Sequence, residues 1–359
     1  MKKMTMMDYI LETPDKAIDN IEHYQELTQT LVEYAQNIGM KRLVLVASGS
    51  SYNACHCARN YLMNTLNLEV KIITPYTFTY YEHHVEEHDV VFVISQSGYS
   101  TNAIAALQKL KEIGCPTIAL TGNPDHDIKD YADLVIDYGV GEELVGYVTK
   151  GVTSLCLYLM LFAIAYSGKT NKLEELKKAI NLNKEMIHKA KDFVQEHYKD
   201  FSSMHQIYVC GAGANYGTAL EGALKCGETI HIPALPLEIE EYIHGPNLQL
   251  TPSYTILLFD GNDEASERVK TIYQASRAVS EHSFLISNHK ALREDHNVLS
   301  LSDTVECDLA PLVYLPFVQV LAATISQDLN SVKQHPLMRQ FKSYADAKTA
   351  SFVNYDEDD

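Results

Sequence analysis

The stretch Val90-Val91-Phe92-Val93-Ile94-Ser95-Gln96-Ser97-Gly98-Tyr99-Ser100-Thr101 joins an apolar run to a turn rich in hydroxyl groups. A helical pattern from Ala103 to Ile113 follows directly. The apolar run predicts a buried strand, and the pattern after it predicts a helix packed against that strand. This stretch therefore predicts the strand–turn–helix unit of an α/β fold.

The turn itself offers four Ser or Thr hydroxyls, the Gln96 amide and the free N–H groups of a helix start. Donors of this kind at the positive end of a helix are suited to binding a phosphate group. Ser and Thr are also the residues that most often cap helices. The turn alone leaves both interpretations open.

The same strand–turn–helix order recurs along the chain. Apolar strands are expected in the first half at residues 41–47, 70–73, 90–94, 117–120 and 134–138, with helical segments between several of them. The order restarts with strands at 206–210, 255–259, 283–286 and 298–301. Such alternation predicts doubly wound, mostly parallel sheets flanked by helices, of the Rossmann-like or flavodoxin-like kind.

We divide the chain into five parts on this pattern. Two tandem α/β domains are expected at 41–168 and 206–330, separated by a Lys/Glu-rich helical connector at 169–205. Helices are expected in residues 1–40, with Pro14 at a helix start, and a C-terminal tail in residues 331–359.

Composition restricts the class of protein. The chain has 359 residues and a net charge of −18, which disfavours nucleic acid and anionic membrane surfaces as partners. Seven scattered cysteines without a CxxC pair, and no signal peptide, favour a reduced cytoplasmic protein. The apolar segment Val152–Tyr166 is too short to span a bilayer and predicts a core helix, whereas Asp356–Asp359 predicts a solvated tail.

A second hydroxyl-rich turn, Ser48-Gly49-Ser50-Ser51-Tyr52-Asn53, follows the first strand. Ligands of open α/β sheets bind at the carboxyl ends of the strands, where both turns are expected. We therefore predict that the two turns share one phosphate group. The residues expected to bind it are Ser50, Ser51, Ser95, Gln96, Ser97 and Ser100, with Thr101 and Gly49 beside them.

Polar residues with acid–base chemistry occur in the second half of the chain. Glu221, Lys225 and Glu228 are spaced to share one helix face, and His244-Gly245-Pro246 follows. A Glu–Lys–Glu ladder can also be an ordinary exposed set of salt bridges, and a histidine before Gly-Pro can be an ordinary turn residue. Their apolar neighbours and the adjoining glycine loop favour a cleft in which Glu228 and His244 move protons.

Two other patterns are weaker. Gly211-x-Gly-x-x-x-Gly217 departs from the spacing of dinucleotide-binding loops, so nucleotide binding is not expected. The histidine-rich segment 81–88 matches no metal-ligand spacing and is interpreted as a solvated loop, and His56 as a packing or surface residue. We expect neither a metal nor an organic cofactor.

Three motifs in order, Ser95-Gln-Ser-Gly, Ala219-Leu-Glu-Gly-Ala-Leu-Lys225 and His244-Gly-Pro, resemble those of the sugar isomerase (SIS) domain family. The resemblance covers nearly the whole chain. It is to the double-SIS isomerase half of glucosamine-6-phosphate synthase and to fructosamine-6-phosphate deglycases. Met6–Pro14 is similar to the segment that leads into that isomerase half.

The resemblance implies roles for single residues. The six residues of the two turns would hold the sugar phosphate, Glu228 would move the proton between C1 and C2, and Lys225 would lie near the sugar hydroxyls. His244 would assist ring opening or leaving-group protonation across a homodimer or higher oligomer with a shared active site. The loop that closes over the sugar is similar at Glu143, Tyr147 and Thr149.

The chain also departs from the synthase. We expect no glutaminase domain, and we expect the synthase's C-terminal tail, whose lysine enters the active site, to be missing. The ending Gln334–Phe341 is closer to the His-Pro-Leu ending of the deglycases. The expected function is therefore release of a hexose 6-phosphate and an amine from a fructosamine 6-phosphate. An aldose–ketose or amino-sugar phosphate isomerase or deaminase, and a non-catalytic phosphosugar sensor, remain alternatives.

Overall fold

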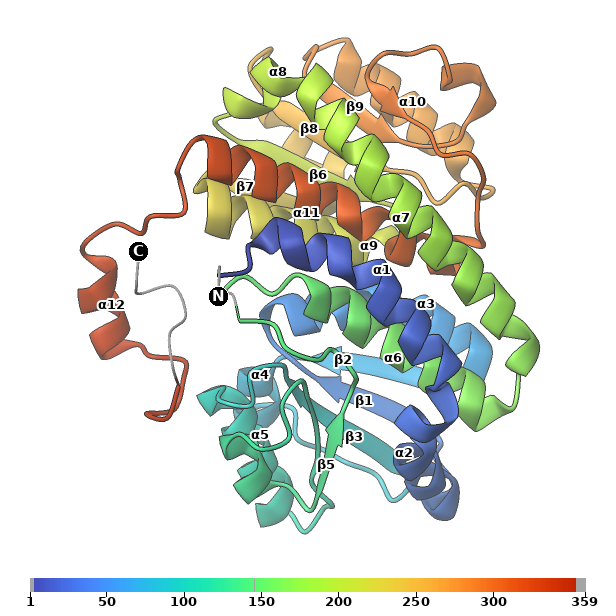
Figure 1. Cartoon of the computed structure of the whole chain (residues 1–359), viewed down its shortest axis with the longest axis vertical. Helices are drawn as coiled ribbons and strands as arrows, with labels where there is room; N and C mark the ends of the chain where they lie inside the picture. Colours follow the sequence, from blue (N-terminus) through green and yellow to red (C-terminus); the bar gives the residue numbers. More distant parts are fainter. Residues whose placement is uncertain (1–2, 145, 353–359) are drawn as a thin grey trace. The chain divides into compact units, whose positions relative to one another are not determined.

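A computed structural model describes residues 3–144 and 146–352 of the chain (Figure 1). The predicted solvated tail Asp356–Asp359 lies outside the described residues. The chain forms two compact units. The first-sheet unit contains residues 16–55, 62–173 and those from 334 onward, and the second-sheet unit contains the first 15 residues, 56–61 and 174–333.

The first-sheet unit is built on five parallel strands in the order β2-β1-β3-β4-β5. Each of the expected strands is present, with small shifts at the ends. The strands are β1 (Arg42–Val46), β2 (Glu69–Ile73), β3 (Asp89–Ser95), β4 (Ile118–Thr121) and β5 (Leu134–Asp137).

Helices cover both faces of this sheet. Phe78 of α4 (Pro75–Tyr80) and Leu107 of α5 (Thr101–Glu112) pack with Val91 and Val93 of β3 on one face. On the other face Phe92 contacts Phe162 of α6 (Lys150–Ser167), edge to face at 5.6 Å between ring centroids. The predicted doubly wound arrangement is therefore confirmed for the first sheet.

The N-terminal residues form α1 (Met6–Glu22) and α2 (Tyr24–Ile38), as expected. The predicted extent of the turn at residues 48–53 is wrong, because α3 (Gly49–Leu66) begins directly after Ser48. The predicted role of Pro14 is wrong, because Pro14 lies inside α1 and does not begin a helix. Proline lacks the N–H that would bond four residues back. Next to Pro14, the Thr13 hydroxyl donates a hydrogen bond to the carbonyl of Tyr9 at 2.7 Å. This turn of the helix therefore gains a side-chain hydrogen bond to its backbone.

The second-sheet unit repeats the plan, with five parallel strands in the order β10-β9-β8-β6-β7. Four strands were expected: β6 (Ile207–Gly211), β8 (Thr255–Phe259), β9 (Ser283–Ile286) and β10 (Val298–Leu299). The fifth, β7 (Ala234–Glu238), was not, because Pro236 interrupts its pattern. Proline is tolerated there since β7 is an edge strand.

The expected connector is the long helix α7 (Leu173–Glu196), followed by α8 (Tyr198–Ser202). The remaining helices of this unit are α9 (Asn215–Lys225), α10 (Ser266–Arg277) and α11 (Ala310–Asp328). One face of the sheet packs on α10 through Val269, Ile272 and Tyr273. On the other, Phe259 meets Phe317 of α11 at 6.3 Å.

Two helical segments, Lys150–Ser167 and Cys307–Asp328, are long and apolar enough to cross a membrane by length and composition. In the apolar windows of these two segments, 83% and 94% of the residues are buried inside the protein, as in the core helices of α/β domains. This burial confirms the core helix predicted from Val152–Tyr166. All seven cysteines are free thiols, and five of them are buried.

Candidate active site

The turn after β3 has the backbone that its sequence predicts. Ser95 ends the strand, Gly98 takes a positive φ of 68°, and α5 begins at Thr101. Ser100 is the residue before the helix, but its side chain makes no capping hydrogen bond. Its hydroxyl accepts instead from the Ser95 hydroxyl at 3.0 Å. Ser100 therefore occupies the N-cap position without a capping bond from its side chain, and phosphate binding stays a prediction.

Residues 123–128 pack against this turn and hydrogen-bond to it. The carbonyl of Ser97 accepts from Nδ1 of His126 at 2.8 Å, and the rings of Tyr99 and His126 stack with centroids 4.2 Å apart. A Cβ at Gly98 would lie 2.8 Å from Cβ of His126, so the close approach as well as the positive φ requires glycine. We define residues 95–101 with this support as the hydroxyl cradle.

The first turn lies beside the cradle, because β1 and β3 are neighbouring parallel strands. Gly49 begins α3 with a φ of 57°, and Ser50 and Ser51 are buried directly after it. Asn102 of α5 donates to the Ser48 hydroxyl at 2.9 Å. The structure thus brings the two predicted turns together at one sheet edge, as the sequence implied.

Gln96 connects the cradle to the start of α6 through Glu143. Gln96 Nε2 donates to Glu143 Oε2 at 2.5 Å, and the N–H groups of Thr149, Lys150 and Gly151 donate to the same carboxylate at 2.8, 2.7 and 3.0 Å. Burial raises the pKa of Glu143, and these four donors oppose the rise. Glu143 therefore acts as a clasp between the cradle and α6.

This clasp bears on three residues predicted to contact the sugar. Thr149 donates its hydroxyl to the carbonyl of Tyr147 at 2.7 Å, inside the loop. Gly151 packs against Gln96 so closely that an added Cβ would lie 1.9 Å from Gln96 Oε1. These hydrogen bonds show that Glu143, Tyr147 and Thr149 hold the loop together. Their contact with a sugar stays a prediction.

In the second-sheet unit, Lys225 lies between two carboxylates. Its Nζ is 3.2 Å from Glu221 Oε1 and is also bonded to Glu228 Oε1. The side chains of Glu221 and Lys225 are fully buried, whereas that of Glu228 is 30% exposed. The exposed-ladder interpretation is therefore wrong, and the cluster presents only the Glu228 end to solvent.

The charges of this cluster set its pKa values. Burial lowers the pKa of Lys225, but Glu221 and Glu228 outweigh it, so the pKa is raised and the ammonium persists. Burial raises the pKa of Glu228, Lys225 lowers it, and Glu221 raises it, with a net rise. A carboxylate with a raised pKa is a stronger base than an ordinary glutamate, which suits proton abstraction.

The helix winding changes where Glu228 lies. The sequence predicts a continuous helix from Thr218 to Thr229, but α9 ends at Lys225 and Cys226–Ile230 form a π-helical turn. Such turns are rare and occur frequently at functional sites. Glu228 lies in this π-helical turn and contacts Lys225, and no periodic pattern in the sequence marks the change of winding.

His244 follows a short helical turn and is exposed. Its Nδ1 lies 2.7 Å from the carbonyl oxygen of Glu240. A carbonyl only accepts, so Nδ1 carries the proton and Nε2 of the neutral ring is left as the basic nitrogen. This arrangement fits the predicted proton shuttle, whose role stays a prediction.

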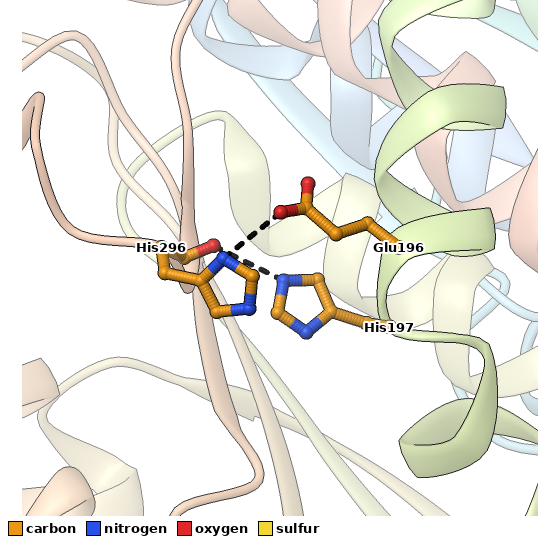
Figure 2. Close-up of side chains that lie close together, drawn as sticks. All are labelled: Glu196, His197 and His296. Carbon is orange, nitrogen blue, oxygen red and sulfur yellow. Dashed lines mark hydrogen bonds and ion pairs between the residues drawn. The ribbon is translucent and has the colours of Figure 1, made fainter.

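Among the described residues, the side chains that could together hold a metal ion do not come from the histidine-rich segment 81–88. Figure 2 shows Glu196, His197 and His296, whose possible ligand atoms lie within 4.8 Å of one another. Glu196 Oε1 is 2.9 Å from Nδ1 of His296, and Nε2 of His197 donates to the His296 carbonyl at 3.0 Å. These bonds already hold the end of α7 against residue 296, and we assign no metal to them.

The C-terminal segment brings a further residue to the cradle. Nζ of Lys348 donates to the hydroxyls of Ser97 at 2.8 Å and Ser100 at 3.3 Å. Whether the synthase's C-terminal tail is replaced stays a prediction, but a lysine of the C-terminal segment does lie against the cradle. Local sequence patterns could not find this contact, because it joins residues about 250 positions apart in the chain.

Two five-stranded parallel sheets of the same strand order, each flanked by helices, define a class of α/β proteins with tandem repeated domains. The SIS domain family matches residues 38–175 and 200–291. The chain belongs to the SIS domain family.

Curated relatives are about a quarter identical to the chain over the part that aligns. Glutamine–fructose-6-phosphate aminotransferase (isomerizing) of Shewanella oneidensis is 26% identical over 79% of this chain and 48% of its own length. The enzyme of the same name from Bacteroides thetaiotaomicron is 25% identical over 89% and 55%. The chain thus spans about half the length of the curated relatives it matches.

Solved structures share the fold over almost the whole chain. A candidate phosphosugar isomerase from Clostridium difficile 630 has a TM-score of 0.87 and 25% identity, with 97% of this chain and 99% of the other covered. The tagatose-6-phosphate ketose/aldose isomerase of Escherichia coli has a TM-score of 0.78 at 13% identity, covering 92% and 96%. The second likeness concerns the fold alone.

Proposed function

We propose that the chain is a phosphosugar enzyme that moves a proton between C1 and C2 of an amino-sugar or ketosamine 6-phosphate. The observation that carries the proposal is the cluster of Glu228, Lys225 and Glu221, in which a part-exposed carboxylate has a raised pKa. The names of the curated relatives support a sugar phosphate as substrate, since they are fructose-6-phosphate aminotransferases.

The hydroxyl cradle would take the phosphate. Ser50, Ser51, Ser95, Gln96, Ser97 and Ser100 are the proposed ligands, with Thr101 beside them. Hydroxyls and N–H groups that are already oriented stabilise a monoester dianion without a change of conformation. The net charge of −18 makes such local donors necessary, because the overall field repels an anion.

We propose deglycation of a fructosamine 6-phosphate as the reaction. Glu228 takes the proton from C1 while the C2 carbonyl oxygen gains one, which converts the ketosamine to an enaminol. Return of a proton to C2 gives the imine at C1. Addition of water to C1 and loss of the amine then release a hexose 6-phosphate, with Nε2 of His244 carrying the proton on oxygen or nitrogen.

The exposed position of His244 leaves it accessible to a second copy of the chain. We propose a homodimer, or a larger oligomer, in which His244 serves the neighbouring site. Dilution should then reduce specific activity in step with the loss of oligomer, as measured by light scattering on the same samples. Full activity in a monomer would contradict this arrangement.

Aldose–ketose isomerisation or deamination of an amino-sugar phosphate is the second candidate. It is favoured by the word isomerizing in the names of the curated relatives and by the similar solved structure described as a phosphosugar isomerase. This reaction would also use Glu228 as its base. A phosphosugar sensor of the cytoplasm would bind the ligand without proton exchange.

A panel of substrates separates these functions. The protein is incubated in D₂O with fructosamine 6-phosphates, amino-sugar phosphates and fructose 6-phosphate, and free amine, hexose 6-phosphate and deuterium at C1 and C2 are measured. Amine release from the fructosamine 6-phosphates alone supports deglycation. Deuterium exchange without amine release indicates an isomerase, and phosphate-dependent binding without exchange contradicts an enzyme.

A further inference from the structure

The C-terminal segment after α12 (Met338–Tyr344) lies along the hydroxyl cradle and pairs with it through one isolated β-bridge. Thr101 N–H donates to the carbonyl of Ala347 at 3.1 Å, and Thr349 N–H donates to the carbonyl of Tyr99 at 2.9 Å. Ser100 and Lys348 form an antiparallel bridge between these bonds. The backbone therefore fixes Lys348 opposite Ser100, the residue directly before α5.

Side chains hold the segment on both sides of this bridge. The ring of Phe352 meets Tyr99 edge to face at 5.8 Å, and Nζ of Lys348 lies 5.4 Å from the centroid of the same ring. Lys348 is half-buried, and its Nζ bonds to the hydroxyls of Ser97 and Ser100. The ammonium is thus held among the proposed phosphate ligands.

We propose that Lys348 is itself a phosphate ligand and supplies the positive charge of the cradle. This inference rests on the proposed function, because it takes the cradle to be the phosphate site. An ammonium group only donates, so Ser97 and Ser100 accept from it and keep their hydroxyl protons for the phosphate oxygens. Donation in such a chain strengthens each following hydrogen bond.

The electrostatics of Lys348 leave room for an anion. Burial lowers the pKa of the ammonium, and Asp346 opposes this only in part. Within residues 3–144 and 146–352, no carboxylate forms an ion pair with Lys348. A phosphate dianion beside Nζ would offset the burial, since an opposite charge within about 4–6 Å favours the charged form.

The same contact could instead block the site, if Lys348 occupies the place of the phosphate. The two roles predict opposite effects of removing the charge. A ligand role means that loss of the ammonium weakens phosphate binding, whereas a blocking role means that it strengthens phosphate binding. A probe without a carbonyl group, inorganic phosphate, tests the cradle apart from any step at the sugar carbons.

The experiment titrates inorganic phosphate into the full chain by calorimetry at low and at moderate salt. The variants are Lys348→Met, Ser97→Ala and the control Lys342→Met, which removes an exposed lysine of the same tail. Thermal unfolding of each variant checks that the fold is kept.

We expect Lys348→Met to weaken phosphate binding roughly 10–100-fold and to flatten its salt dependence, as loss of a charged hydrogen bond does. Lys342→Met should stay within about twofold of the parent, a change well below a single hydrogen bond.

The outcomes distinguish the inference from the function on which it rests. Equal or tighter phosphate binding by Lys348→Met, together with weaker binding by Ser97→Ala, overturns the role of Lys348 and leaves the cradle standing. An unchanged affinity in Ser97→Ala, or no phosphate binding by the parent protein, overturns the cradle as the phosphate site and the inference with it.

Discussion

The turn after β3 and the turn after β8 hold the same place in two sheets of the same strand order, but their chemistry is opposite. The first is the hydroxyl cradle, Ser95–Thr101. The second, residues 260–266, reads Asp-Gly-Asn-Asp-Glu-Ala-Ser and carries three carboxylates. A repeated fold therefore does not imply a repeated ligand site, because binding depends on the side chains that the turn presents.

The buried acid of the second turn works inside the protein. Asp260 is almost fully buried, and its carboxylate accepts from the hydroxyls of Ser266 at 2.7 Å and Ser287 at 2.6 Å and from the N–H of Asn262 at 3.0 Å. These bonds tie the turn to α10 and β9. The second turn thus uses its acceptors for stability, whereas the first is the turn that we propose binds phosphate.

The largest expected effect separates proton transfer from phosphate binding. Glu228→Gln should reduce turnover and C1/C2 deuterium exchange by roughly 10²–10⁴-fold, because it removes the proposed base. Phosphate affinity should not change, since the cradle is untouched. Glu264→Gln, an exposed acid of the second turn, is the matched control and should keep full turnover. Near-normal exchange in Glu228→Gln would rule out the mechanism.

The next effect concerns the buried cluster. Lys225→Met should destabilise the fold by about 3–5 kcal/mol, because it leaves the buried Glu221 without its cation. Urea unfolding measures this loss. The double variant Glu221→Gln/Lys225→Met should recover part of it, and a double variant as unstable as the sum of the singles would show that the pair does not interact.

A crossed pair of variants tests the two turns directly. Asp260→Ala should lower the free energy of unfolding by about 2–3 kcal/mol, because three donors lose their partner, while phosphate affinity stays constant. Ser97→Ala should weaken phosphate binding about tenfold with little change in stability. Loss of phosphate binding in Asp260→Ala would mean that the second turn also serves the ligand.

The smallest effect is a shift in the pH profile. Burial and Glu221 raise the pKa of Glu228, so the acid limb of turnover should lie at a higher pH than an ordinary glutamate gives. Glu221→Gln removes a like charge, so deprotonation of Glu228 becomes easier and the limb moves to lower pH. Deuterium exchange measured across the pH range reports this shift, and a limb moving upward would contradict the coupling.

The sheets could be predicted from the sequence because their strands are continuous apolar runs, typical of parallel sheets covered on both faces. Nine of the ten strands were expected on this signal. The edge strand β7 was missed, because Pro233 and Pro236 suppress the pattern of a strand that pairs on one side only. Edge strands are where the apolar signal is weakest.

The site was predictable where its residues are close in sequence. Ser95 to Thr101 form one turn, and Glu221, Lys225 and Glu228 lie within two turns of helix. The π-helical turn at Cys226–Ile230 and the bond of Lys348 to Ser97 were not predictable. The first depends on how α9 packs, and the second on the path of a segment distant in the chain.

The contact between Gly151 and Gln96 has a consequence for the thermodynamics of binding. The Glu143 carboxylate bonds both to Gln96 and to the N–H groups at the start of α6, so these residues form one connected piece of structure. A Cβ at position 151 would displace the end of the Gln96 side chain from this arrangement. A receptor that is rigid before its ligand arrives loses little conformational entropy on association. Phosphate binding should therefore carry a small entropic penalty, and a bulkier residue at 151 should make that penalty grow.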